Sequence, residues 1–117
     1  ENAIKYLKSF SSSDLLIQAR AYSLIGDAYV EIMDYDNAIK YFKKASSNNP
    51  NEYFTPTYLL KLALVYEQLD DLESALDCYT SIINEFKESS EFQISIKNRK
   101  RIEGLMLWVL TLVLTIN

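Results

Sequence analysis

The stretch ARAYSLIGDAYVEIMDYDNAIKYFKKASSNNP, from Ala19 to Pro50, decides the fold of this chain. Its first half carries apolar residues three or four positions apart, which form one stripe on a helix: Tyr22, Ile25, Tyr29 and Ile32. Its second half repeats that spacing at Ala38, Ile39, Phe42 and Ala45. The residues between the stripes favour a short connection, in which Asp34 or Asp36 caps the second helix. Helices joined so briefly run antiparallel, so the stretch predicts a helical hairpin.

The same stretch resembles a tetratricopeptide repeat in the residues at its packing positions: Tyr22, Ile25, Gly26, Tyr29, Ala38, Phe42, Ala45 and Pro50. The resemblance implies an all-α fold, a TPR-type superhelix in which hairpins stack because one repeat cannot cover its own apolar faces. It also implies that the domain holds a segment of another protein. Gly26 and Ala38 are expected to let the two helices approach closely, while Tyr29 and Phe42 fill the space above and below.

The pattern recurs on both sides of the central stretch. Downstream, a second full repeat carries its packing residues at the same spacing: Leu59, Leu62, Ala63, Tyr66, Ala75, Tyr79 and Ile82. Upstream, NAIKYLK from Asn2 nearly copies NAIKYFK from Asn37, so the opening helix resembles the second helix of a repeat. We therefore predict a single domain over 1–117: a partial repeat at 1–13, full repeats at 14–50 and 51–88, and a capping helix and apolar tail helix at 89–117. Since the chain starts inside a helix, we expect a piece of a longer protein.

The segment from Leu105 to Ile116 is apolar apart from Thr111 and Thr115, and Gly104 is expected to interrupt or end the helix before it. The segment is shorter than the roughly 20 residues of a membrane helix, so we do not expect it to cross a membrane. It could be a buried terminal helix, a helix lent to a second copy, the truncated beginning of an anchor, or a segment foreign to the native protein. We favour burial, within the chain or across a homodimer formed through 105–116, which would shield Trp108 from solvent.

The composition argues against catalysis. The chain has no histidine, two glycines and one cysteine, Cys78, which removes the commonest general base, phosphate-cradling loops and cysteine-based zinc sites. Two acidic pairs fall at the same place in each repeat and fit helix caps better than catalytic or calcium-binding carboxylates: Asp34 with Asp36, and Asp70 with Asp71. The net charge of −4 gives no reason to expect nucleic acid as a partner. We therefore expect neither an enzyme nor a bound metal or cofactor.

In the family that the chain resembles, the concave wall is lined mostly by the first helix of each pair. Projected onto this chain, the partner-binding wall consists of Arg20, Ser23, Asp27, Val30, Glu31, Thr57, Leu60, Lys61, Leu64, Glu67 and Gln68. We expect it to bind an extended or helical segment of another protein. Members that grip the C-terminal carboxylate of chaperones use Lys and Asn there; because Asp27 would repel a carboxylate, we expect such peptides not to bind. Tyr35, Tyr53 and Tyr58, in or near expected loops, are either further partner contacts or exposed aromatic residues.

Two features leave alternatives open. A basic run fits a solvated helix face, and could also touch RNA or acidic lipid: Lys97, Arg99, Lys100 and Arg101. The run from Ile82 to Ser89 resembles bacterial cell-envelope members of the family, so we expect a bacterial source, with a cytoplasmic or envelope-associated location left open. The alternative to partner binding on the wall is self-association or membrane-linked assembly through the apolar C-terminal helix.

Overall fold

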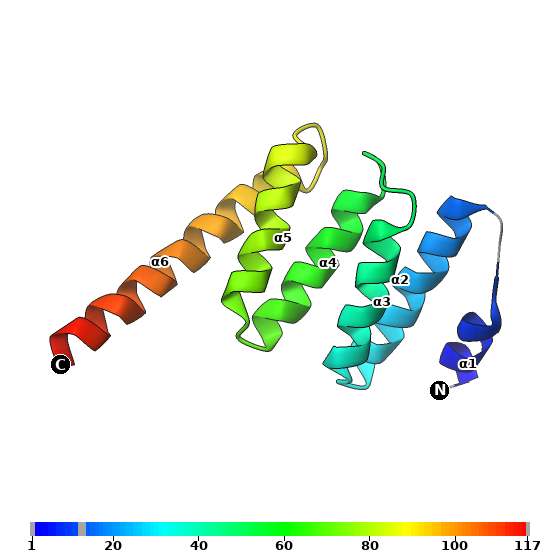
Figure 1. Cartoon of the computed structure of the whole chain (residues 1–117), viewed down its shortest axis with the longest axis horizontal. Coiled ribbons are helices and arrows are strands. Elements are labelled where there is room, and N and C mark those ends of the chain that lie inside the picture. The colour runs from blue at the N-terminus through cyan, green and yellow to red at the C-terminus, as the bar shows by residue number, and fades with distance from the viewer. Residues whose placement is uncertain (1, 12–13, 117) are drawn as a thin grey trace.

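The computed structural model describes residues 2–11 and 14–116 and contains six α-helices in that part of the chain (Figure 1). They are α1 (Asn2–Ser9), α2 (Leu15–Glu31), α3 (Tyr35–Ser47), α4 (Thr55–Gln68), α5 (Leu72–Glu85) and α6 (Phe92–Ile116). The described residues form no β-strand. The predicted all-α fold is confirmed.

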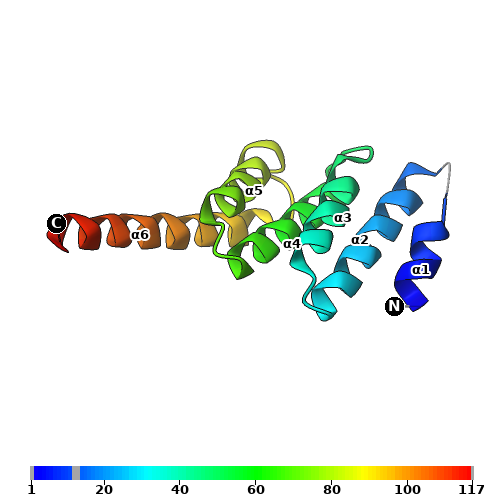
Figure 2. The ribbon, with the colours of Figure 1, turned by 60° about the horizontal axis from the view of Figure 1, so that its bottom comes forward.

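Each helix packs against the next one along the chain, so the molecule is a row of helices 54 Å long and 16 Å across its shortest axis. Helices α2 and α3 form one antiparallel hairpin, and α4 and α5 form the next (Figures 1 and 2). Helix α1 packs on α2 at one end of the row, and α6 packs on α5 at the other. We propose that the whole row is one domain, because its packing contacts run from α1 to α6 without a break.

Equivalent turns close the two hairpins. Met33 and Asp70 stand at the same place and both adopt the left-handed conformation, with φ of 61° and 58°. The residue that follows each of them caps the next helix. Asp34 Oδ1 accepts a hydrogen bond from the Asn37 amide, and Asp71 Oδ1 accepts one from the Ser74 amide. One acid of each pair, Asp34 or Asp71, therefore supplies a helix cap, because its carboxylate satisfies an amide that the first turn leaves without a partner.

Small residues bring the two helices of each hairpin together. Gly26 is buried, and a Cβ atom built on it would lie 2.5 Å from Cε1 of Phe42. In the next hairpin Ala63 and Ala75 are both 0% exposed. Of the residues named above as packing positions, all are buried except Tyr22 and Leu59, which are half-buried, and Pro50, which is exposed. The apolar stripes thus meet between the layers and form the continuous core expected for stacked hairpins.

Helix α6 differs from the sequence-based expectation. Gly104 neither interrupts nor ends it: the helix runs through to Ile116, and no glycine of the described residues has a positive φ. Nothing lies within 4 Å of the position where a Gly104 Cβ would be. A glycine inside a helix costs about 1 kcal/mol, which strong helix formers such as Leu105 and Met106 can offset.

The first half of α6 occupies the place of a third hairpin's first helix. Its buried residues Ser95, Asn98 and Ile102 repeat the spacing of Leu59, Leu62 and Tyr66 in α4. At the position of Gly26 and Ala63, however, α6 carries Arg99. This long side chain leaves no room for another helix at the same close approach, so the repeat pattern stops here.

Beyond Met106, which packs against the core, α6 projects alone past α5 (Figures 1 and 2). All described residues from Leu107 to Ile116 are exposed, and Trp108 is 63% exposed. The expected burial of this segment within its own chain is wrong, because the row of helices has no neighbour there to cover it. We call residues 105–116 the α6 extension.

Candidate functional site

Helices α2 and α4, the first helices of the two hairpins, form a wall joined by one lysine. Lys61 Nζ of α4 donates hydrogen bonds to both carboxylate oxygens of Asp27 in α2, at 3.0 and 2.9 Å, and one to Ser23 Oγ at 3.4 Å. The ion-paired side chains are 35% and 42% exposed. At such exposure a salt bridge adds about 1 kcal/mol at most, so its main effect is to fix the spacing between the two helices.

A hollow of about 380 Å³ opens on this wall. It is lined by Arg20, Ser23, Leu24, Asp27, Tyr53, Phe54, Thr57, Tyr58 and Lys61. Arg20 also lines two smaller hollows beside it, of about 210 and 150 Å³. The three hollows therefore meet at the Arg20 guanidinium, for which the described residues provide no ion pair.

Apolar side chains surround Arg20 on this surface. The two smaller hollows are lined mainly by apolar or aromatic residues: Tyr6, Leu7, Leu16, Ile17, Phe10, Ala21, Leu24, Phe54 and Tyr58. Several of these are large and exposed, including Leu16 at 44%, Ile17 at 49% and Leu24 at 44%. Such an apolar surface suits a ligand segment that offers apolar side chains.

Only part of the wall that the sequence predicts lies around the main hollow. Five of the expected residues line it: Arg20, Ser23, Asp27, Thr57 and Lys61. Val30 and Leu60 pack instead against the core, and Glu67 faces α6. Glu31, Leu64 and Gln68 are exposed outside the hollow. Partner contact at any of these eleven positions stays a prediction.

Sequence reasoning missed two residues that line the main hollow, Leu24 and Phe54, whereas Tyr53 and Tyr58 were among the possible partner contacts. Leu24 lies next to Ile25 of the apolar stripe in the sequence, and it is 44% exposed. Phe54 precedes α4 in a loop whose path is set by Asn51, whose Oδ1 accepts hydrogen bonds from the amides of Tyr53 and Phe54. The sequence signal was the pair of aromatic residues in a polar loop, but its position over α2 depends on how the hairpins stack.

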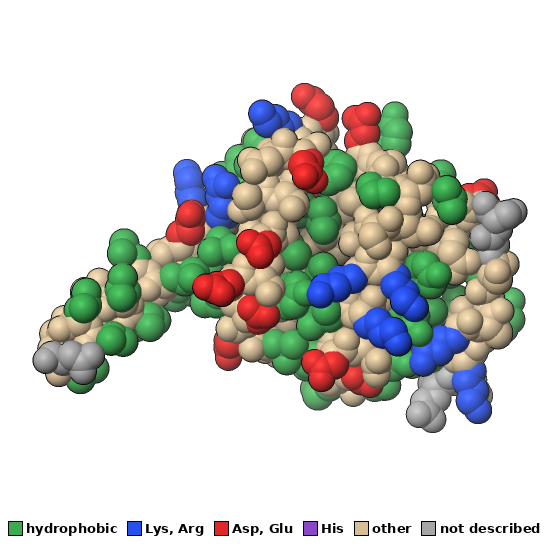
Figure 3. Space-filling view, viewed as in Figure 1, with side chains coloured by type: hydrophobic (Ala, Val, Ile, Leu, Met, Phe, Trp, Pro, Cys, Tyr) green, Lys and Arg blue, Asp and Glu red, His purple; other side chains and the backbone are tan. Residues whose placement is uncertain are grey.

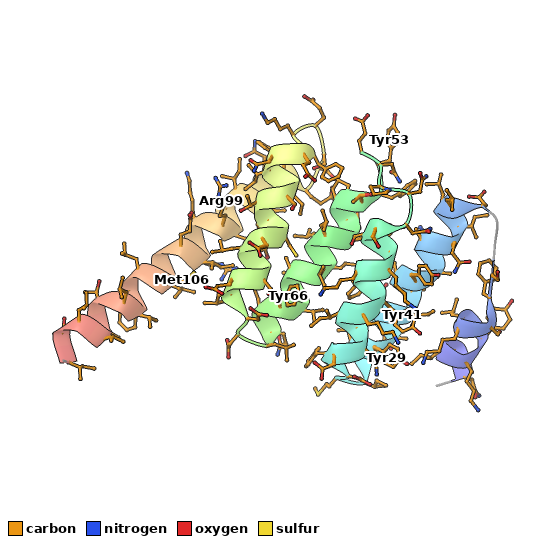
Figure 4. The ribbon with its side chains drawn as sticks, viewed as in Figure 1. Tyr29, Tyr41, Tyr53, Tyr66, Arg99 and Met106 are labelled. Atoms are coloured by element: carbon orange, nitrogen blue, oxygen red, sulfur yellow. The ribbon has the colours of Figure 1, made fainter. Side chains whose placement is uncertain are left out.

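The three tyrosines expected near loops have different environments. Tyr58 lies near the loop, in the first turn of α4, and is only 7% exposed, so it is not an exposed aromatic residue. Burial raises the pKa of its phenol, opposed by the nearby Arg20 charge. Tyr35 begins α3 and packs partly against the core. Tyr53 is 82% exposed and points away from the helices (Figure 4).

The Asp27–Lys61 pair changes the argument about carboxylate-bearing peptides. The expected repulsion by Asp27 is largely compensated, because Lys61 Nζ lies 2.9 Å from its Oδ2 atom. The same pairing also occupies the lysine that could otherwise hold a carboxylate. Non-binding of chaperone tails therefore remains a prediction, but its physical basis is the engagement of Lys61 rather than repulsion.

A second polar junction fixes α6 to the hairpins. Arg101 Nη2 donates to Glu67 Oε1 at 2.6 Å, the Tyr79 hydroxyl donates to Glu67 Oε2 at 2.6 Å, and Asn98 Nδ2 donates to the Tyr79 hydroxyl at 3.2 Å. Burial, followed by the hydrogen bond to the Glu67 carboxylate, raises the pKa of Tyr79. Of the basic run, Arg101 thus binds Glu67 of α4, although it is exposed, as are Lys97 and Lys100.

The described residues offer no obvious reacting group. No three His, Cys, Asp or Glu side chains among residues 2–11 and 14–116 are placed to hold a metal ion. Burial, with the neighbouring Asp77 charge, raises the pKa of the Cys78 thiol to about 12, so the thiol stays protonated near neutral pH and is a poor nucleophile. A search of the helices in the described ranges finds none with the length and apolar character to cross a bilayer.

Comparison with known proteins gives a family and one relative. The chain is 35% identical over 65 residues to "Uncharacterized protein ycf37" of Guillardia theta. The aligned region covers 56% of this chain and 35% of that protein. The chain thus matches about a third of the relative's length, and the expected bacterial source remains a prediction. No solved structure matches. Residues 18–88, more than half of the chain, match the model of the tetratricopeptide repeat. The chain therefore belongs to the tetratricopeptide repeat family.

Proposed function

We propose that the chain binds a segment of another protein on the wall formed by α2 and α4. Tetratricopeptide repeats are stacked helical hairpins that generally serve as protein-interaction modules and present extended binding surfaces. The proposal that this chain is a scaffold and not an enzyme follows from the same family character. Its partner would lie over the hollows that meet at Arg20.

The single observation that carries the proposal is the apolar surface around Arg20. Leu16, Ile17 and Leu24 are each more than 40% exposed there, next to a hollow of about 380 Å³. Such a surface is suited to anchoring side chains of an extended or helical segment, because burying them releases water from both partners.

A peptide selection tests this proposal. Random peptides displayed on phage are selected on the folded chain, and the strongest binders are titrated by fluorescence anisotropy against wild type, Leu24→Glu and Ile94→Glu. Ile94 is a matched control, since it is 38% exposed on α6 and lies outside the three hollows. We expect Leu24→Glu to weaken binding by about tenfold or more, which corresponds to about 1.4 kcal/mol. Equal losses in the two variants would place the binding surface elsewhere.

A second candidate function is self-association through the α6 extension, and a specific observation favours it. Beyond Met106 the extension is exposed. Its two threonines do not make its surface polar, because the hydroxyls of Thr111 and Thr115 donate to the carbonyls of Leu107 and Thr111 in the same helix. A helix that is apolar on all sides is normally buried. Sedimentation velocity over a range of concentrations tests this: a dimer lost in Leu107→Glu/Leu114→Glu supports it, whereas a monomer that floats with lipid vesicles supports membrane-linked assembly instead.

A further inference from the structure

The heptapeptide that opens the chain is repeated in α3, and the repetition places lysines on both sides of α2. NAIKYLK in α1 carries Lys5 and Lys8, and NAIKYFK in α3 carries Lys40 and Lys43, followed by Lys44. Both helices pack against α2. The space-filling view shows the result, with Lys and Arg side chains gathered over α1 and α3 while Asp and Glu side chains gather around α5 (Figure 3).

Three of these lysines converge on Tyr41. The Nζ atoms of Lys8, Lys40 and Lys44 lie 5.7, 5.7 and 4.9 Å from the centroid of its ring. The three nitrogens can therefore be no farther apart than about twice that distance, which is close to the Debye length of about 10 Å at 0.1 M salt. Their positive charges repel one another, and a bound anion would relieve that repulsion.

The lysine ammonium groups lie over a cluster of tyrosine rings. Tyr41 stacks on Tyr29 with ring centroids 5.8 Å apart and contacts Tyr22 at 6.3 Å (Figure 4 shows Tyr29 and Tyr41 side by side). Lys8 Nζ lies 5.2 Å from the Tyr29 ring and Lys44 Nζ lies 5.6 Å from the Tyr22 ring. Because Tyr41 is 8% exposed and Tyr29 is 6% exposed, these rings are fixed in the core and hold the lysines in place.

A hollow of about 250 Å³ opens beside this cluster, between α1, α2 and α3. Its described lining contains Lys8 and Lys44 and no carboxylate: Leu7, Lys8, Phe10, Ser11, Gln18, Tyr22, Ile25, Tyr41 and Lys44. A hydrogen bond with Tyr29 is the largest cause that raises the pKa of Lys8, and the charge of Asp34 contributes less. The hollow is thus mainly cationic, with hydroxyl groups available as hydrogen-bond donors.

The geometry points to a carboxylate-binding site in this hollow, where Lys8 and Lys44 hold acidic side chains of a partner polypeptide. Among the described residues the second hairpin has no equivalent of this site, because α5 carries Asp77, Cys78 and Ser81 where α3 carries Lys40, Tyr41 and Lys44. It lies apart from the Asp27–Lys61 pair and does not include Arg20. It shares Leu7 and Phe10 with the hollows around Arg20, but its two lysines are not used by the proposed function of the α2/α4 wall.

Charge distribution favours a short acidic peptide over a nucleic acid or an anionic membrane. The chain as a whole has a net charge of −4, and exposed acids including Asp70, Asp71, Glu73 and Asp77 lie in or beside α5. A long polyanion or a lipid surface extending beyond the lysines would meet these acids and be repelled. A short acidic segment can contact the lysines alone.

An anisotropy titration tests the inference. A fluorescein-labelled peptide of about ten glutamates is titrated with the chain at roughly 20 mM salt, with a glutamine peptide of equal length as control. We expect binding of the glutamate peptide only, and a loss of about tenfold or more in Lys8→Gln/Lys44→Gln. The matched control Lys97→Gln/Lys100→Gln removes the same charge from exposed positions on α6 and should lose less than about twofold. Equal losses in both double variants, or no binding by wild type, would overturn the inference.

Two further measurements keep the test decisive. Amide chemical shifts of the unaltered chain should change at Lys8, Tyr41 and Lys44 when the glutamate peptide is added. This measurement does not depend on whether any variant folds. Chemical shift changes confined to other residues would contradict the site. Single-stranded RNA of about ten nucleotides and vesicles containing phosphatidylserine are titrated in parallel, and tighter binding of either than of the peptide would overturn the choice of partner. Leu24→Glu should leave glutamate binding unchanged, so failure here and failure of the α2/α4 proposal are separable.

Discussion

Gly26 of α2 lies directly against the ring of Phe42 in α3. A Cβ atom at Gly26 would be 2.5 Å from Cε1, 2.7 Å from Cδ1 and 2.9 Å from Cζ of that ring. Phe42 is itself 1% exposed, so the ring has little room to move away. This contact sets how closely the two helices of the first hairpin can approach, and the stability of the hairpin depends on it.

Gly26→Ala is expected to destabilise the fold by about 1–3 kcal/mol, because the added methyl group overpacks the contact with Phe42. Gly104→Ala is the matched control. Nothing lies within 4 Å of that Cβ position, so the substitution should stabilise α6 by about 0.5–1 kcal/mol through helix propensity alone. Urea denaturation followed by circular dichroism measures both values. A stable Gly26→Ala variant would show that the hairpin is not closely packed.

The junction between α4, α5 and α6 should depend more on Glu67 than on Arg101. Glu67 accepts hydrogen bonds from both Arg101 and Tyr79, and Tyr79 is 0% exposed. Glu67→Ala leaves the buried hydroxyl of Tyr79 without its acceptor and should cost about 1–3 kcal/mol. Arg101→Ala removes a side chain that is 46% exposed, so it should cost about 1 kcal/mol at most. Hydrogen exchange of the α6 amides reports both effects, and equal losses of protection would argue against this ranking.

Alkaline pH should unfold the chain through Cys78. Its pKa is raised from 9.0 to about 12 in the folded state by burial, while the unfolded thiol ionises at its ordinary value. Between those values the unfolded state binds fewer protons than the folded state, so stability is full below pH 9 and falls as pH rises towards 12. The slope contributed by one such group is at most about 1.4 kcal/mol per pH unit. Tyr79, whose pKa is also raised by burial, adds to the fall above pH 10.

Denaturation midpoints measured at several pH values check this prediction, with Cys78→Ala as the comparison. The variant lacks the thiol, so its stability should decline less steeply between pH 9 and pH 10, before the tyrosine contributes. Parallel curves for the variant and wild type would contradict a raised thiol pKa. At neutral pH, alkylation of Cys78 by iodoacetamide should be slow in the folded chain and fast in urea, because the thiol is buried.

Trp108 reports the state of the α6 extension, since it is the only tryptophan in the sequence. It is 63% exposed in a single copy of the chain, so iodide should quench its fluorescence strongly at low protein concentration. If the extension mediates self-association, quenching should weaken as concentration rises, because a second copy covers the ring. Leu107→Glu/Leu114→Glu should remain strongly quenched throughout. Weak quenching of dilute wild-type protein would contradict the exposure of the extension.

The sequence by itself determined the elements and their pairing. The spacing of Tyr22, Ile25 and Tyr29 predicts a helix with one apolar stripe. Asp34 and Asp71 each cap the start of the second helix of a hairpin. These features are local, because they depend on residues within one or two turns. The family resemblance then gave the stacking of the hairpins, since each leaves an apolar face that only a neighbour can cover.

Only the tertiary structure decided which surfaces are formed between elements. The sequence contains two NAIKY segments, but the convergence of Lys8 and Lys44 on Tyr41 requires α1 and α3 to pack on the same helix. The pairing of Asp27 with Lys61 likewise depends on the distance between α2 and α4. Gly104 gave a misleading local signal, because a glycine's preference of about 1 kcal/mol is weak beside the propensity of its neighbours. Contacts between elements are set by packing of the whole row, and no local pattern specifies them.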